Sequence, residues 1–265
     1  MSHITLHTTK HAEPLTPGSR LTEHAAQLSC TVRETPLIVK VFNINKDLLR
    51  FWKALPEATL VTQHRATEYL QLKDSYILGE ERLGDRFLVR PIYKELCERF
   101  ERESYGNWVV AGSSGIGKTI FAAYYMWIAA CKNKTVVWEP FHQAGPTRSF
   151  LMTSGGIEPV DIKSPQLLKA LSNSETVYIV DGHAPALHLN TWTLLVTSPE
   201  REHYCHLLKR RDSCLLYMSP WSYEEMQICK SILYPDEAIL PTTLMDRLFE
   251  WYGGVPRYIL GFAAF

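Results

Sequence analysis

One glycine-rich octapeptide constrains the fold of this 265-residue chain more than any other feature. It runs through Gly112, Ser113, Ser114, Gly115, Ile116, Gly117, Lys118 and Thr119. These residues fill the pattern GxxxxGK[ST], in which glycines let several backbone N–H groups face one concavity. The apolar run WVVA precedes the octapeptide and an apolar stretch, 119–130, follows it. The sequence therefore predicts a buried strand, a phosphate-binding loop and a helix whose N-terminus faces the phosphates.

The same loop predicts roles for its last two side chains. The Lys118 ammonium would reach the β and γ phosphates of a nucleotide, and the Thr119 hydroxyl would bind Mg²⁺. Such a site also needs an acid at the end of another buried strand, and Asp181 follows the apolar residues 177–180. An ordinary Asp-Gly turn at Asp181 is the alternative. We therefore expect Mg²⁺ and a nucleoside triphosphate as cofactors. ATP is preferred to GTP, because no guanine-selecting NKxD pattern follows the loop.

Two further positions bear on hydrolysis. The strand-like run WTLLVTS ends in Thr197 and Ser198, where a polar side chain would sense the γ phosphate. Thr197 is the first choice and Ser198 the second, and a turn before Pro199 is the alternative. Gly182 stands directly after Asp181, where many ATPases have a glutamate that orients the attacking water. Either another acid such as Glu200 does this, or hydrolysis is slow and the site is a switch.

The rest of the chain indicates an α/β fold. Five short apolar runs alternate with helical segments, which predicts a parallel sheet covered on both faces. These runs are NWVVAG, TVVWEP, TVYIVDG, WTLLVTSP and CLLYMSP. The segment SFLMTSGG is expected to add a hairpin between the second and third runs. A helix is predicted from Pro91, and helices alone are predicted after Pro220.

Composition shifts divide the chain into four parts. Residues 1–26 are polar and lack periodicity, so they are interpreted as a leader or linker. Residues 27–85 form a small α+β unit, with strands in LSCTV and LIVKVF and a helix that begins near Asp47. Residues 86–220 form the nucleotide-binding core, and residues 221–265 form a helical lid.

Charge and cysteine content limit the partners and the compartment. The formal net charge is zero, which argues against constitutive binding to nucleic acid. The basic run at residues 209–211 (Lys209, Arg210, Arg211) leaves nucleic acid open as a partner. The six scattered cysteines indicate reduced thiols, and the group His203, Cys205, His206 and Cys214 lacks the spacing of a zinc site. No signal peptide or membrane span is recognised, so we expect a soluble cytoplasmic or nuclear protein.

Six segments, in order, resemble the NTPase module shared by Crinkler effectors and retrotransposon hot spot proteins. They are FLVRPIYKEL, VVAGSSGIGKT, YIVDG, LLVTSPE, LYMSPWSYEEM and FEWYGGVPRYIL. The resemblance covers about residues 86–262 and implies a P-loop ATPase with an additional strand, related to the AAA and STAND groups. It also implies a cation at Arg257 near the γ phosphate.

The resemblance bears on partners and location too. It implies a ubiquitin-like N-terminal unit, a host or nuclear protein partner, and delivery into a host cell and its nucleus. Residues 28–80 match such a unit only faintly, and LQLKDSYIL does not reproduce the expected translocation motif. Many members continue into a nuclease-like domain, which is not recognised in this sequence, so the resemblance does not carry nuclease activity over to it. Assembly with further copies of the chain is left open.

Together these observations predict an ATP-binding P-loop protein that hydrolyses ATP slowly or uses it as a conformational switch. In the switch, the nucleotide would control the helical lid and its partners. Two alternatives remain at this point. One is a protein-interaction module whose nucleotide site is vestigial, and the other is a small-molecule phosphotransferase on the same loop.

Overall fold

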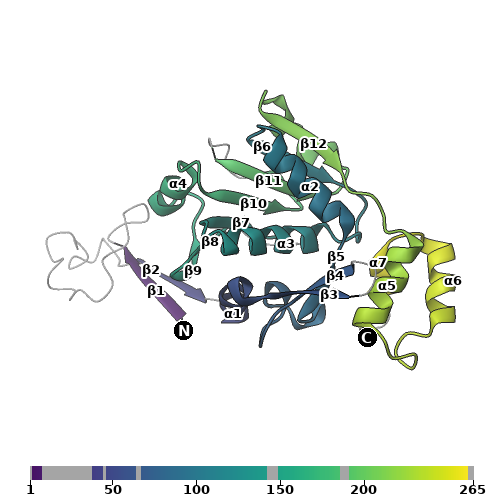
Figure 1. The fold of residues 1–265 in the computed structure, drawn as a ribbon. Helices are drawn as coiled ribbons and strands as arrows, with labels where there is room; N and C mark the ends of the chain where they lie inside the picture. The colour runs from purple at the N-terminus through teal and green to yellow at the C-terminus, as the bar shows by residue number, and fades with distance from the viewer. Residues whose placement is uncertain are drawn as a thin grey trace, which may run out of the picture.

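Seven strands form one mixed sheet in the order β12-β6-β11-β10-β7-β8-β9 (Figure 1). The computed structural model describes residues 2–7, 38–43, 46–63, 67–141, 149–185 and 191–261. The five parallel strands are β6 (Asn107–Ala111), β7 (Val136–Glu139), β10 (Val177–Asp181), β11 (Trp192–Thr197) and β12 (Ser213–Tyr217). An antiparallel hairpin of β8 (Ser149–Thr153) and β9 (Gly156–Val160) extends the sheet beyond β7. The predicted α/β class, the five strands and the added hairpin are confirmed.

Alternating side chains of the sheet bury two separate apolar layers, because successive residues of a strand point to opposite faces. On one face, Trp108 and Ile179 belong to the cluster that contains α2 (Pro91–Arg102) and α3 (Lys118–Cys131). On the other face, Val109 and Tyr178 pack with Leu167 and Leu171 of α4 (Pro165–Leu171). Burial on both faces explains why these strands are almost continuously apolar.

The order of the strands brings distant segments to one edge of the sheet. β11 lies between β6 and β10, so the strand before the glycine-rich loop and the strand that ends in Asp181 are not neighbours. In the register, Thr197 stands beside Ala111, and Asp181 stands beside Val196. Because parallel strands end on the same edge, the loop, Asp181 and Thr197 all lie at the carboxyl edge.

The N-terminal part forms two smaller antiparallel sheets. β3 (Thr59–Gln63), β4 (Thr67–Gln71) and β5 (Arg86–Val89) make one of them. Helix α1 (Lys46–Ala54) precedes this sheet and contributes Phe51 and Trp52 to the same apolar cluster as α3. The Trp52 indole N–H donates to the carbonyl of Thr153 in the hairpin at 2.8 Å. The N-terminal part therefore shares a core with the large sheet.

Two features of this part differ from the sequence prediction. β5 begins at Arg86 and pairs with β4, so the small sheet extends to Val89, past residue 85, where the sequence analysis ended the unit. β1 (Ser2–His7) pairs with β2 (Ile38–Asn43), although a leader or linker was expected over residues 1–26. The strand predicted in LSCTV lies outside the described residues. The ubiquitin-like interpretation stays a prediction.

The chain ends in a group of helices at one end of the molecule (Figure 1). They are α5 (Tyr223–Leu233), α6 (Thr242–Tyr252) and α7 (Pro256–Ile259). Ser222 and Glu225 form a reciprocal capping box at the start of α5. Short 3₁₀ turns lie at Leu55–Glu57, Ile77–Gly79, Glu81–Leu83, Arg201–His203 and Leu207–Lys209. None of the helices in the described ranges is long and apolar enough to cross a membrane.

Candidate functional site

The glycine-rich loop joins β6 to α3 as predicted. Gly115 and Gly117 adopt left-handed φ angles of 83° and 99°, which other residues rarely adopt. A Cβ atom at Gly115 would lie 2.7 Å from Cβ of Arg257, so only glycine fits beneath that arginine. Gly117 is the N-cap of α3 and offers no side-chain cap. The first N–H groups of α3 therefore receive no acceptor from a capping side chain, which suits an anion.

Lys118, Thr119 and Asp181 gather beside this loop. The Lys118 Nζ atom donates to the carbonyl oxygens of Gly112 and Ser113, both at 2.7 Å. The Thr119 hydroxyl donates to Asp181 Oδ2 at 2.7 Å, although the two residues are 62 positions apart. The structure thus brings together the two side chains that the sequence analysis assigned to a metal.

Burial dominates the electrostatics of this cluster. Asp181 is only 7 % exposed, and this burial raises its pKa, while the Thr119 hydroxyl and the Lys118 charge oppose the shift. Burial also lowers the pKa of Lys118, and Asp181 counteracts that effect. A nearby cation stabilises the ionised form of a carboxylate that burial makes costly to ionise. The cluster is therefore suited to a divalent ion that keeps Asp181 charged.

The donors present fit Mg²⁺ better than a transition metal. A hydroxyl and a carboxylate are hard oxygen ligands, and Mg²⁺ in nucleotide sites takes one or two such groups plus phosphate and water. Among the described residues, no three His, Cys, Asp or Glu side chains converge on a point that would hold a metal.

Thr197 and Ser198, the two candidate phosphate sensors, both face a histidine. Thr197 is fully buried at the end of β11, and its Oγ1 atom lies 2.8 Å from Nδ1 of His203. Ser198 Oγ lies 3.3 Å from the same nitrogen. The backbone carbonyl of Thr197 accepts from the N–H of Gly112 at 3.2 Å, which ties this strand end to the loop.

Glu200, the alternative water-orienting acid, is mostly exposed. Its side chain is 72 % exposed and lies 3.6 Å from Nε2 of His203. Gly182 has a φ of 75°, and a Cβ atom there would lie 2.6 Å from the Phe141 ring. The aromatic ring therefore fills the direction in which a side chain after Asp181 would leave the backbone.

Arg257 lies over the glycine-rich loop. Its guanidinium donates to Ser114 Oγ at 3.1 Å, and its backbone N–H is 3.4 Å from the carbonyl oxygen of Gly115. These contacts join α7 directly to the loop across 143 residues of sequence. A second cation besides Lys118 is thus available to a ligand of the loop.

Two aromatic side chains that the sequence analysis did not assign hold the other end of the loop. The Tyr93 hydroxyl donates to the carbonyl of Gly117 at 2.9 Å, and the Trp221 indole N–H donates to the carbonyl of Ile116 at 2.8 Å. Trp221 also donates its backbone N–H to the carbonyl of Gly254 at 2.8 Å. The loop is therefore linked to α2 and, through Trp221, to the segment that leads into α7.

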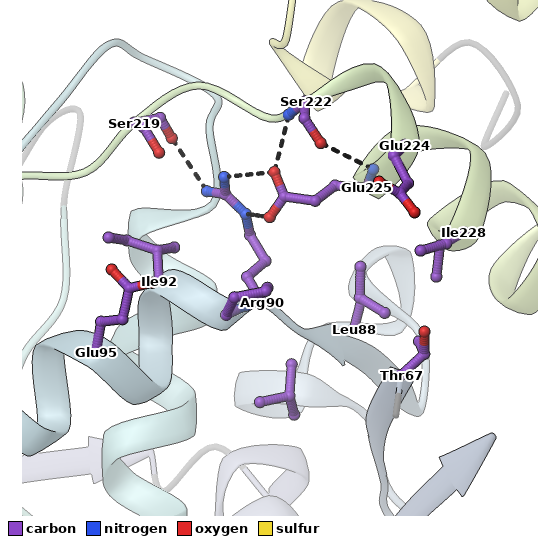
Figure 2. A pocket seen from close by; sticks show the side chains of 12 residues that line it. Thr67, Leu88, Arg90, Ile92, Glu95, Ser219, Ser222, Glu224, Glu225 and Ile228 are labelled. Atoms are coloured by element: carbon purple, nitrogen blue, oxygen red, sulfur yellow. Dashed lines mark hydrogen bonds and ion pairs between the residues drawn. The ribbon is translucent and has the colours of Figure 1, made fainter. Parts of the chain in front are cut away.

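Trp221 is in turn held by a buried ion pair that the sequence analysis also missed. The Arg90 guanidinium stacks 4.8 Å from the centre of the Trp221 ring and bonds to both carboxylate oxygens of Glu225, at 2.9 and 3.1 Å. Figure 2 shows this pair beside Ser219, whose carbonyl accepts from Arg90 at 3.2 Å. Arg90 and Glu225 also line a cavity of ≈ 460 Å³ that reaches from β5 to α5.

The basic run at residues 209–211 contains one arginine that is paired with an acid. Arg210 pairs with Asp212 at 3.2 Å, and Lys209 is exposed. The run begins at Lys209, the last residue of a 3₁₀ turn, and leads to Asp212, whose backbone carbonyl accepts from the N–H groups of Gly106 and Asn107 at the start of β6. Nucleic acid stays a prediction for this surface.

Comparison with known proteins gives no match that would assign a function to this site. No protein-family model matches the chain, and no curated protein matches it either. The arrangement consists of a glycine-rich loop at a helix N-terminus, two cations, and a hydroxyl–carboxylate pair. Chemically, it is suited to holding a polyphosphate and one divalent ion.

Proposed function

We propose that this chain binds Mg-ATP at residues 112–119 and uses it as a switch or hydrolyses it slowly. The observation that carries the proposal is the 2.7 Å hydrogen bond between Thr119 of the loop and Asp181 at the end of β10. A turn that merely joined a strand to a helix would not need a buried acid from a strand two positions away in the sheet. Coordination of one Mg²⁺ ion would use both Thr119 and Asp181.

The sheet order supports a finer fold assignment. We propose that the core is a P-loop NTPase of the additional-strand type, because β11 separates β6 from β10. We also propose a relationship with the NTPase module of Crinkler effectors and retrotransposon hot spot proteins. The segments that carry this resemblance include the residues that contact the loop, namely Tyr93, Trp221 and Arg257.

Each residue of the site would contact a different part of Mg-ATP. The loop N–H groups and the N-terminus of α3 would bind the phosphates, and Lys118 would neutralise their charge after leaving the carbonyls of Gly112 and Ser113. Thr119 and Asp181 would hold Mg²⁺, which withdraws charge from the phosphate oxygens when bound. Arg257 would add a cation on the side of Ser114. Thr197 would offer a hydroxyl from the next strand.

The surroundings of Gly182 favour a slow enzyme or a switch. Many ATPases have a glutamate directly after the magnesium-binding acid to orient the attacking water, and the position after Asp181 holds glycine packed against Phe141. Glu200, the acid considered instead, is mostly exposed and faces His203. Nucleotide exchange would then change the protein through Arg257 and Trp221, which connect the loop to the C-terminal helices.

Magnesium dependence is the experiment that tests this function. ATP and GTP binding and hydrolysis should be measured with and without Mg²⁺ for the parent protein, Thr119→Ala and Asp181→Ala. We expect Mg²⁺ to strengthen ATP binding in the parent and to have little effect in either variant, because each variant lacks one of the two metal ligands. If ATP bound the parent no better with Mg²⁺ than without it, the vestigial-site alternative would be favoured. Transfer of phosphate to a metabolite instead of water would favour the phosphotransferase.

A further inference from the structure

His203 is a polar side chain next to the site, and the function proposed above does not use it. Its Nδ1 atom lies 2.8 Å from Oγ1 of Thr197 and 3.3 Å from Oγ of Ser198. Its Nε2 atom lies 3.6 Å from a carboxylate oxygen of Glu200. The imidazole therefore stands between a fully buried hydroxyl at the carboxyl edge of the sheet and an exposed acid.

The direction of the bond between Thr197 and His203 decides what Thr197 can do. A hydroxyl has one proton and can donate only one hydrogen bond at a time. If Thr197 donated to the imidazole, its oxygen would present only lone pairs to a neighbouring phosphate. If Nδ1–H donated to Thr197 Oγ1, the hydroxyl proton would be free to bond to an anionic oxygen. Only the second arrangement suits a nucleotide.

The position of the imidazole is fixed by the turn that carries it. His203 closes the 3₁₀ turn Arg201–His203, and its backbone N–H donates to the carbonyl of Glu200 at 3.1 Å. The next residue, Tyr204, is buried, and its hydroxyl donates to the carbonyl of Pro199 at 3.1 Å. The ring is thus presented to Thr197 by an anchored turn, which is the behaviour of a preorganised group.

We propose that His203 is a positioning residue for γ-phosphate recognition. Its Nδ1–H holds the oxygen of Thr197 so that the Thr197 hydroxyl donates to a terminal phosphate oxygen. When both ring nitrogens carry a proton, Nδ1–H donates to Thr197 while Nε2–H faces the Glu200 carboxylate. The inference rests on the proposed function, since it assigns a second residue to the sensing of the phosphate that distinguishes ATP from ADP.

The test is a double-mutant cycle on the affinities for Mg-ATP and Mg-ADP, which needs no turnover. His203→Ala should reduce the preference for ATP over ADP about two- to tenfold, the range for one hydrogen bond, while the ADP affinity stays unchanged. The same change in a Thr197→Val background should have no further effect, because the residue through which His203 acts is gone. His206→Ala, which removes an exposed histidine three residues later, is the matched control and should leave the preference unchanged.

Conservative replacements separate positioning from support of the fold. The amide nitrogen of an asparagine reaches about as far as Nδ1, whereas that of a glutamine reaches as far as Nε2. His203→Asn should therefore retain most of the ATP preference, and His203→Gln should not, with equal melting temperatures for the two variants. If Asn and Gln behaved alike, or if His203→Ala had the same effect with and without Thr197, the positioning role would be refuted.

Failure of the inference is distinguishable from failure of the proposed function. A parent protein that prefers ATP over ADP while His203→Ala retains that preference would overturn the role of His203 alone. A parent protein that binds no Mg-ATP would overturn the proposed function and the role of His203 with it.

Discussion

Removal of Arg90 should destabilise the fold, because the Glu225 carboxylate would stay buried without its partner. Arg90 is 1 % exposed and makes four polar contacts, two to Glu225 and two to the carbonyls of Ser219 and Pro220. Breaking a buried ion pair from one side costs about 3 to 5 kcal/mol. Because Glu225 is still 18 % exposed, we expect the low end of that range. Arg90→Met should therefore reduce the free energy of unfolding by about 3 kcal/mol.

Thermal and urea unfolding, followed by circular dichroism, provide the assay. A loss of about 3 kcal/mol corresponds to a fall in melting temperature of about 6 to 12 °C for a protein of this size. Glu225→Gln should cost a similar amount, because it leaves the Arg90 charge buried. The double variant should cost less than the two single changes added together, because neither charge remains.

The exposed pair Arg82–Glu80 is the matched control. Its side chains are 79 % and 42 % exposed, and exposed pairs contribute about 0 to 1 kcal/mol. Arg82→Met should leave stability within about 0.5 kcal/mol of the parent. Equal effects of Arg90→Met and Arg82→Met, or additive effects of Arg90→Met and Glu225→Gln, would refute the reasoning from burial.

Three further predictions follow from the site. Asp181→Asn should raise the melting temperature at neutral pH, because burial raises the pKa of Asp181 and makes its ionised form costly. This gain in melting temperature should vanish below the ordinary aspartate range, where the carboxyl group is protonated in both the folded and unfolded states. For the same reason, calorimetry should show Mg²⁺-dependent ATP binding weakening on acidification at a higher pH than an exposed aspartate would allow, whereas a pH-independent affinity would exclude Asp181 as a ligand. Arg257→Ala should reduce ATP affinity more than ADP affinity in nucleotide titrations, and equal losses would assign Arg257 to the fold or to the shared phosphates.

The elements that could be predicted from the sequence are those whose signals are local. Apolar runs of three to five residues mark the buried strands, and the glycines mark the loop at residues 112–117. Asp181 could be placed because it ends such a run. The N-terminal boundary could not be placed, because the pairing of Arg86–Val89 with β4 depends on a partner about twenty residues earlier. β1 was missed because its six residues contain only two apolar positions.

The site residues that escaped prediction act through contacts between distant parts of the chain. Trp221 reaches the loop across 105 residues, and Glu225 reaches Arg90 across 135. No spacing rule connects such pairs before the fold is known. His203 was considered only as a metal ligand, because its contact with Thr197 depends on how the turn after β11 folds back.

Calorimetric titration of Mg-ATP into the parent protein and Lys118→Ala tests the central claim most directly. Lys118 already donates to two loop carbonyls, so its ammonium group stands at the loop that is proposed to hold the phosphates. Its loss should weaken ATP binding about ten- to a hundredfold, the equivalent of a charged hydrogen bond. Lys134→Ala, which removes a lysine paired with the exposed Glu175, should leave the affinity unchanged. Binding of ATP to Lys118→Ala as tightly as to the parent would contradict the account.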